Sequence, residues 1–544
     1  MKSTADHRMP RAPLARRLVL LAALCAGTAS FAQAPAAAPA TAAGPAPAGF
    51  DNCPMIGWPE LLPAYLKPGA PFPTEDTKNM PTPDCAFHQW SWEAFVWATA
   101  LNSNGVPRFM MLPTPADLFT DAKSAGDIHP RKLKLGHRAL QAKADGTFTE
   151  SAGAIVEADS NMLVSPNGYP VYASVHMNPS YFATAKRNLI ATGGYTSQPA
   201  NDFFDVGAAV FKATWLRLDP GQQPPAGAYV TQAEVPVLTV YRTKNTMTVA
   251  PSGQTVTVNV ALVGLHVVGY TVNHPEFLWA TFEHQDNTPK FPDNTWDATS
   301  TASDPKGYTF YQANTPWQNI NYNQGNQAAP YLLKFDLASQ KFTTVTVPVN
   351  GPNFTTAGTT RSTSVGTNVV LANQTGSETN SPQGPSNIAS LNKSAKTFYA
   401  GLPAPQNAFG SYFLVGTVWM LPNTYVPSNP NALTLNNTNA VGSVNLANTT
   451  AETFFQVPAV QPSNAVPTTG GNTMLNCFLC HNATSYNFQN NPPKLPARLV
   501  ALSHVLGAGS PYAVPNVMPV LVPQSTPPPT TEVKSLAAPA PRRQ

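Results

Sequence analysis

The chain has 544 residues, of which only 11% are charged, and it contains 57 Pro and 34 Gly. This composition is typical of exported proteins with many turns and extended segments, and it argues against a helical bundle. Residues 1–32 hold five of the 32 Lys and Arg residues and one of the 28 Asp and Glu residues, so the remainder carries 27 of each. Because that remainder is neutral and has no long apolar stretch, the sequence predicts neither a nucleic-acid partner nor a transmembrane anchor.

The N-terminus has the pattern of a secretory signal peptide. Five basic residues up to Arg17 precede the apolar run 18–29, and small residues surround Ala32. A positive start, an apolar core too short to span a bilayer and a small-residue end mark such peptides. We therefore expect residues 1–32 to be removed, the mature chain to be periplasmic or secreted, and the Ala- and Pro-rich residues 33–50 to be a flexible linker.

Export also bears on the five cysteines of the chain. Cys25 leaves with the signal peptide, and Cys477 and Cys480 form a C-x-x-C pair. In an oxidising compartment two remaining cysteines usually pair. The sequence thus predicts a disulfide between Cys53 and Cys85.

A body rich in β-structure is expected over residues 51–460. Early in it, residues 85–102 are predicted to form a helix whose apolar stripe lies in the core, because Trp90, Ala94, Trp97 and Leu101 recur at helical spacing. From about 106 to 350, apolar residues alternate with polar ones, and Pro, Gly, Asn and Asp punctuate the runs. The runs are Phe211, Ala213, Trp215; Val256, Val258, Val260, Leu262; Leu333, Phe335, Leu337; and Val345, Val347, Val349.

The second half of the body adds a long loop over 351–385, a helix at 387–400 and a strand at Tyr412–Met420. The expected fold class is therefore mainly β with a few helices, a sandwich- or barrel-like body. A small haem-bearing segment of helix and loop is expected near the C-terminus.

The segment Cys477-Phe478-Leu479-Cys480-His481 has the pattern of a c-type haem attachment site. Two residues between the cysteines let both sulfurs reach one edge of the porphyrin, and the His that follows directly can bind the iron. With 10 His in 544 residues, His would follow a C-x-x-C by chance only about 2% of the time. A zinc site would need two more compactly spaced ligands, and a thioredoxin-like dithiol would need a βαβ context, which the Pro- and Asn-rich surroundings do not suggest.

The sequence thus predicts one covalent haem c in a segment over residues 461–515, with thioethers at Cys477 and Cys480 and His481 as the proximal ligand. Because a Pro- and Thr-rich loop precedes the motif and a Pro-rich tail, 516–544, follows it, a compact cytochrome domain is not expected. The haem is expected to dock on the β-rich body instead.

Three possibilities remain open for the second axial position of the iron. Met518 lies 37 residues after His481, at the entrance to the tail, and would raise the reduction potential. His504 lies 23 residues after His481, in a predicted helix over Pro496–Leu506, and is either a ligand or a hydrogen-bonded core residue. An open position would permit peroxide or small-ligand chemistry.

A second group of titratable residues lies within His274–His284, which contains Glu276 and Glu283. Their spacing matches no known metal signature, and on a helix the two histidines would point apart. The simpler interpretation is structural: the polar groups fix the end of the preceding strand and pair with backbone. The alternative makes His284 or His266 a haem-pocket residue that reaches the iron from the body.

Several segments together resemble a family of exported bacterial proteins of uncharacterised activity with a single C-terminal C-x-x-C-H. They are Trp92–Phe95, His274–His284, Tyr412–Trp419, Leu446–Phe454 and the haem motif. The resemblance implies haem attachment and export, and no particular activity.

Three functions fit these features. The first is a c-type cytochrome that exchanges single electrons with a redox partner protein or with a small-molecule donor or acceptor. The second is a haem peroxidase or oxidase with an open distal site and an acid/base residue such as His284 or Glu283, although familiar di-haem peroxidases need two C-x-x-C-H motifs. The third is a binding module that uses haem as a sensor or structural clamp.

Overall fold

A computed structural model of the chain describes the body in separate ranges and the C-terminal region at two short strands. The described residues are 60–75, 85–128, 132–136, 140–142, 148–150, 165, 167–191, 204–242, 247–272, 274–289, 301, 303–311, 313–314, 331–346, 359–360, 384–420, 440–442, 448–451, 486–487 and 494–495. All later statements about the structure concern these residues.

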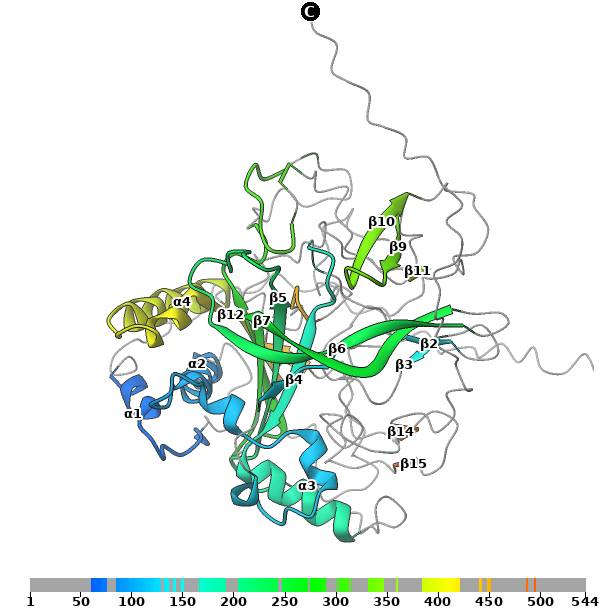
Figure 1. Ribbon diagram of the computed structural model, residues 1–544. Coiled ribbons are helices and arrows are strands. Elements are labelled where there is room, and N and C mark those ends of the chain that lie inside the picture. The colour runs from blue at the N-terminus through cyan, green and yellow to red at the C-terminus, as the bar shows by residue number, and fades with distance from the viewer. Residues whose placement is uncertain are drawn as a thin grey trace, which may run out of the picture. The chain divides into compact units, whose positions relative to one another are not determined.

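The body is built on one eight-stranded sheet in which the long strand β7 (Met247–Thr271) is the common neighbour of three others (Figure 1). β7 pairs antiparallel with β6 (Val230–Arg242), with β5 (Ala209–Arg217) and with β8 (His274–His284). β4 (Tyr172–Met177) extends the sheet beside β5, and β12 (Tyr412–Met420) and β13 (Ala440–Gly442) extend it beside β8. β1 (Leu133–Lys134) completes it by pairing parallel with β6.

Smaller pairings lie outside this sheet. β9 (Tyr331–Asp336) pairs with β10 (Lys341–Thr346) and β11 (Thr359–Thr360). Two more two-stranded pairs are β2 (Leu140–Ala142) with β3 (Phe148–Glu150), and β14 (Tyr486–Asn487) with β15 (Lys494–Leu495).

The helices are few, as expected for a mainly β fold. They are α1 (Leu62–Leu66), α2 (Cys85–Thr99), α3 (Pro179–Ala191) and α4 (Gly384–Ala400), with the short 3₁₀ turns η1 (Arg108–Met111), η2 (Pro115–Phe119), η3 (Ala125–Asp127) and η7 (Gln406–Ser411). Among the described residues, no helix is long and apolar enough to cross a membrane.

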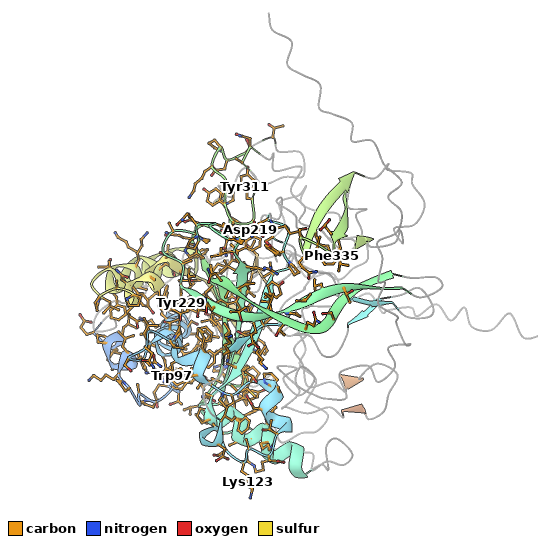
Figure 2. All side chains as sticks on the ribbon, in the orientation of Figure 1. Trp97, Lys123, Asp219, Tyr229, Tyr311 and Phe335 are labelled. Atoms are coloured by element: carbon orange, nitrogen blue, oxygen red, sulfur yellow. The ribbon has the colours of Figure 1, made fainter. Side chains whose placement is uncertain are left out.

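One face of the sheet, called here the first face, is covered by α2. Phe95 stacks on Phe282 of β8 with ring centroids 4.2 Å apart, and Trp97 stacks on Phe211 of β5 at 5.8 Å. Trp97 lies in the side-chain layer between α2 and the sheet (Figure 2). The predicted apolar stripe is therefore core, and the structure extends it, because Trp90, Trp92 and Phe95 on different sides of the helix are all buried.

A helix with so few exposed side chains must be enclosed on most sides, and α1 and α4 provide the rest of the enclosure. Nε1 of Trp92 donates to Oδ1 of Asn392 in α4, at 3.1 Å, and Tyr65 at the end of α1 donates to Glu93 at 2.8 Å. α2 ends at Thr99, three residues before its predicted end, because the chain reverses between Asn102 and Val106, with Gly105 at φ 73°.

The other predictions for the body are largely confirmed. The strand Tyr412–Met420 is β12, the helix 387–400 is α4 with an earlier start, and Phe211, Ala213 and Trp215 are fully buried on β5. Two of the predicted apolar runs include a residue that is not buried. Val256 is 39% exposed, and Leu337, just beyond β9, is 48% exposed. Val347 and Val349 lie outside the described residues, as does all of the loop predicted over 351–385 except 359–360 and the start of α4.

The stacking of α2 on β8 generates a prediction about stability. Replacing Phe282→Ala removes a fully buried ring that contacts Phe95 and Trp92, and we expect it to lower the free energy of unfolding by about 3–5 kcal/mol. The matched control Val272→Ala removes a side chain that is 48% exposed and should change it by less than about 0.5 kcal/mol. Urea unfolding of the two variants measures both values, and equal effects would contradict the assignment of the core.

Candidate functional site

The residues of the predicted haem site lie outside the described residues. This holds for Cys477, Cys480 and His481, and also for His504, Met518 and Cys53. Cys85 is the first residue of α2. Because Cys53 lies outside the described residues, the disulfide between the two stays a prediction. What the structure places are two elements on either side of the motif in the sequence: the turn Asn448–Ala451 before it and the β14–β15 pair after it.

The His274–His284 segment is strand β8, and this geometry separates its titratable residues. The two ends of an 11-residue strand lie about 33 Å apart at 3.3 Å per residue. His274 and Glu276 lie at one end, and Glu283 and His284 lie at the other, where adjacent side chains point to opposite faces. The four residues therefore form no common centre.

At the first end, His274 and Glu276 form a buried pair. Nδ1 of His274 donates to Oε1 of Glu276 at 2.7 Å, and the two side chains are 6% and 4% exposed. The ring of His274 packs edge-on against Phe87 at the start of α2, and Phe87 packs in turn on Trp419. Such a pair, enclosed by rings, fixes the end of a strand and offers no open path to a substrate.

A second histidine, His88 of α2, completes this end of the core. Its Nδ1 lies 3.1 Å from Oγ1 of Thr417 on β12, and Oγ1 of Thr417 lies 2.6 Å from Oγ of Ser91. The hydroxyl of Ser91 donates to the carbonyl of Phe87. Nε1 of Trp419 and Oγ1 of Thr271 are buried here without a hydrogen-bond partner among the described residues. Ordered water is the usual partner of such atoms.

At the other end, His284 lies on the first face, inside the core. Its ring packs edge-on against Tyr412, with centroids 5.2 Å apart, and its Nδ1 accepts the backbone N–H of Asp286 at 3.2 Å. Burial lowers the pKa of His284 to about 4, and Asp286 and the backbone of Ala226 offset this only in part. His284 is therefore a neutral core residue on the first face, and the interpretation in which it reaches a haem iron from the body stays a prediction.

Glu283 lies on the opposite face, called here the second face, and it holds a turn of the chain. Its Oε1 accepts the backbone N–H of Thr449 at 2.9 Å, and its Oε2 accepts from Nδ2 of Asn287 at 3.2 Å. Glu283 is only 2% exposed. A buried carboxylate with two donors is a structural anchor, and it is not placed to act as an acid or base on a bound substrate.

The turn Asn448–Ala451 is fully buried against the second face. Nδ2 of Asn448 donates to the carbonyl of Phe282 at 3.3 Å, and Oγ1 of Thr450 lies 2.5 Å from Oγ1 of Thr214 on β5. The turn approaches so closely because residue 264 is glycine: a Cβ there would lie 2.6 Å from Oγ1 of Thr214 and would collide with Oγ1 of Thr450.

His266 is the histidine that the second face presents. It stands opposite Thr281 of β8 and opposite Lys212 of β5, and its Nδ1 is hydrogen-bonded to Oγ1 of Thr281. This hydrogen bond holds the orientation of the ring, as is common for histidines that bind metals. Among the described residues, no group of three or more His, Cys, Asp and Glu is arranged to hold a metal ion.

A shallow hollow of about 500 Å³ lies beside the His284 end of β8. Its rim carries Asn167, Gln222 and Tyr308, and the ion pair between Lys306 and Asp286, 2.8 Å long, crosses it. Because the charges are paired and the amides bond to each other and to backbone, the hollow presents a neutral polar surface.

The sequence singled out His266, Glu283 and the segment around Asn448, but it did not connect them. The missed residue is Gly264, the contact point of turn and sheet. An isolated Gly inside an apolar strand indicates close approach of another backbone. The sequence Val263-Gly264-Leu265 has this pattern.

Comparison of the chain with family models, with curated proteins and with solved structures finds no match in any of the three. The resemblance to exported single-haem proteins therefore rests on the motifs of this sequence alone.

The burial of His284 generates a prediction about pH. Because its folded pKa of about 4 lies below the ordinary 6.5, the unfolded chain binds the proton more readily, and stability is lost as the pH falls from 6.5 towards 4. Between pH 7 and 4.5 this residue should cost roughly 2–3 kcal/mol of unfolding free energy. Urea unfolding at several pH values measures the slope.

His284→Gln cannot titrate and should flatten that slope by the same amount, although buried His176, whose pKa burial also lowers to about 4, will leave part of it. Gln285→Ala, a change at the exposed neighbouring position, is the matched control and should keep the full slope. An unchanged slope in His284→Gln would show that His284 takes up its proton as easily in the folded chain as in the unfolded one.

Proposed function

We propose that this chain is an exported c-type cytochrome that carries one covalent haem and transfers single electrons. The observation that carries the proposal is Cys477-Phe478-Leu479-Cys480-His481, in a chain that begins with the pattern of a signal peptide. Covalent haem attachment takes place after export, so the two features support each other. The mature protein is periplasmic or secreted.

The roles of the motif residues follow from their chemistry. Cys477 and Cys480 form the two thioethers, and His481 binds the iron from the proximal side. The attached haem supplies one-electron redox chemistry. His504 and Met518 are the two candidates for the second axial position, and either would fill the iron's coordination and favour electron transfer over reaction with small ligands.

The arrangement of the body favours electron transfer over the peroxidase alternative. A peroxidase needs an acid/base residue at an open distal site. Glu283, one candidate, is 2% exposed and accepts two hydrogen bonds, and His284, the other, is buried beside Tyr412. Because both residues are engaged inside the body, neither is offered as the acid/base residue of a peroxidase. The proposed partner is therefore a redox protein or a small-molecule electron donor or acceptor.

The attachment chemistry has a direct test. The mature chain, made in a host that installs c-type haem, should gain the mass of one haem and keep its Soret absorption after denaturation. Replacing both cysteines, Cys477→Ala with Cys480→Ala, should remove both signals, because no thioether can form. The matched control Cys53→Ala with Cys85→Ala should keep them. A parent protein without the mass increment would refute the proposal.

The axial ligation has a separate test. Absorption spectra with and without cyanide or carbon monoxide distinguish a six-coordinate low-spin iron, which we expect, from an open site. If Met518 or His504 is the ligand, Met518→Ala or His504→Ala should convert the spectrum to a high-spin form that binds carbon monoxide. If neither variant changes the spectrum, both candidates are wrong.

A further inference from the structure

The second face of the sheet carries three rows of side chains that run across β5, β7, β8 and β12. The register places Thr214, Gly264, Glu283 and Phe413 in the anchor row; Lys212, His266, Thr281 and Gly416 in the polar row; and Val210, Val268, Trp279 and Val418 in the apolar row. Residues directly opposite each other on paired strands share a face, so each row is continuous.

The apolar row is buried, although α2 and α4 lie on the other face. Val210, Val268, Trp279 and Val418 are 5%, 4%, 6% and 0% exposed, and none of them belongs to the aromatic core under α2 or to the smaller cluster around Val263 and Phe310. α3 packs against β4 and β5, at one side of the sheet. A further part of the same chain must therefore cover the row on β8 and β12.

The turn Asn448–Ala451 identifies that part of the chain. It is seated on the anchor row by Glu283, Thr214 and the space left at Gly264, so the chain that continues from Ala451 starts on the second face. The apolar row lies four residues further along β5, β7 and β8, or about 13 Å away. Cys477 follows Ala451 by 26 residues, a length that spans this distance several times over.

The composition of the following segment fits an apolar surface. Between Glu452 and Lys494 the chain contains no Asp, Glu, Lys or Arg, and it begins with Thr453-Phe454-Phe455. A segment without charge can lie on Val268, Trp279 and Val418 without burying an unpaired ion. Lys212, in the polar row, offers a single cation of the kind that pairs with a carboxylate.

We propose that the second face is the docking surface for the chain's own C-terminal segment, residues 452–495, and that the haem lies over its polar row. The position of the segment follows from the turn and the rows. The part that concerns the haem rests on the proposed function: His266, fixed by Thr281, faces the haem, and Lys212 pairs with one of its carboxylates.

Lysine cross-linking of the full mature chain tests the docking. Lys494 is the only lysine between Lys396 and Lys534, and a short amine-reactive cross-linker should join it to Lys212. Lys393 and Lys396, exposed on α4 beyond the first face, are the internal controls and should not be joined to it. Cross-links from Lys494 to α4, or none to Lys212 in the chain without haem, would overturn the proposal.

The same cross-link should form in the haem-free Cys477→Ala, Cys480→Ala variant. Absence of haem from the parent protein would thus refute the function without touching the docking. Because Lys212 pairs with a haem carboxylate in the haem-loaded protein, a missing Lys212 cross-link in the haem-free variant is the result that would refute the docking alone. In the haem-loaded protein, His266→Ala should shift the Soret band or the reduction potential. An unchanged spectrum and potential would overturn the placement of the haem over the polar row.

Substitutions at the anchor test the cause of the docking. Gly264→Ala pushes the turn off the sheet, and we expect about a tenfold lower yield of the Lys212–Lys494 cross-link because several hydrogen bonds are lost. Gly307→Ala, whose added Cβ meets nothing within 4 Å, is the matched control and should keep the parent yield. If Gly264→Ala does not fold, the milder Glu283→Gln replaces it, and parent yield in a folded anchor variant would overturn the role of the anchor.

Discussion

The packing of α2 against the first face of the sheet is the contact on which the rest of the body depends. Phe95 stacks on Phe282 and Trp97 on Phe211, and most side chains of the helix are buried, with Gln89 and Glu93 only partly exposed. A helix of this kind is stable only when it is enclosed, so α1, α4 and the sheet must come together around it. This leaves the second face as the side of the sheet on which other parts of the chain can assemble.

The polar residues of β8 show how a strand can carry many titratable groups without being a catalytic centre. His274 and Glu276 are hydrogen-bonded to each other among rings, His284 is held neutral by burial, and Glu283 binds the backbone of a turn. The His274–Glu276 pair and Glu283 are hydrogen-bonded locally, whereas Nε2 of His284 is buried without a hydrogen-bond partner among the described residues. We therefore propose that the chemistry of the protein lies at Cys477–His481 and that the body supports it.

The second face links this support to the proposed haem site through the chain itself. The turn Asn448–Ala451 holds the start of the C-terminal segment, and the uncharged sequence that follows suits the apolar row. A haem held against a rigid sheet keeps a fixed orientation towards a redox partner, whereas a haem on a free tail would not. The two proposals therefore describe one arrangement, in which attachment comes from the motif and orientation comes from the sheet.

The sequence by itself determined the features that depend on local spacing. Helix α2 follows from the recurrence of Trp90, Ala94 and Trp97, β12 follows from an apolar run, and the haem motif needs only neighbouring residues. Only the tertiary structure decided what residues distant in sequence do together. It put Glu283 and His284, adjacent in the chain, on opposite faces, and it brought Thr449, 166 residues away, to Glu283. Side-chain direction in a strand and partners across a sheet depend on register and long-range packing, which local spacing does not encode.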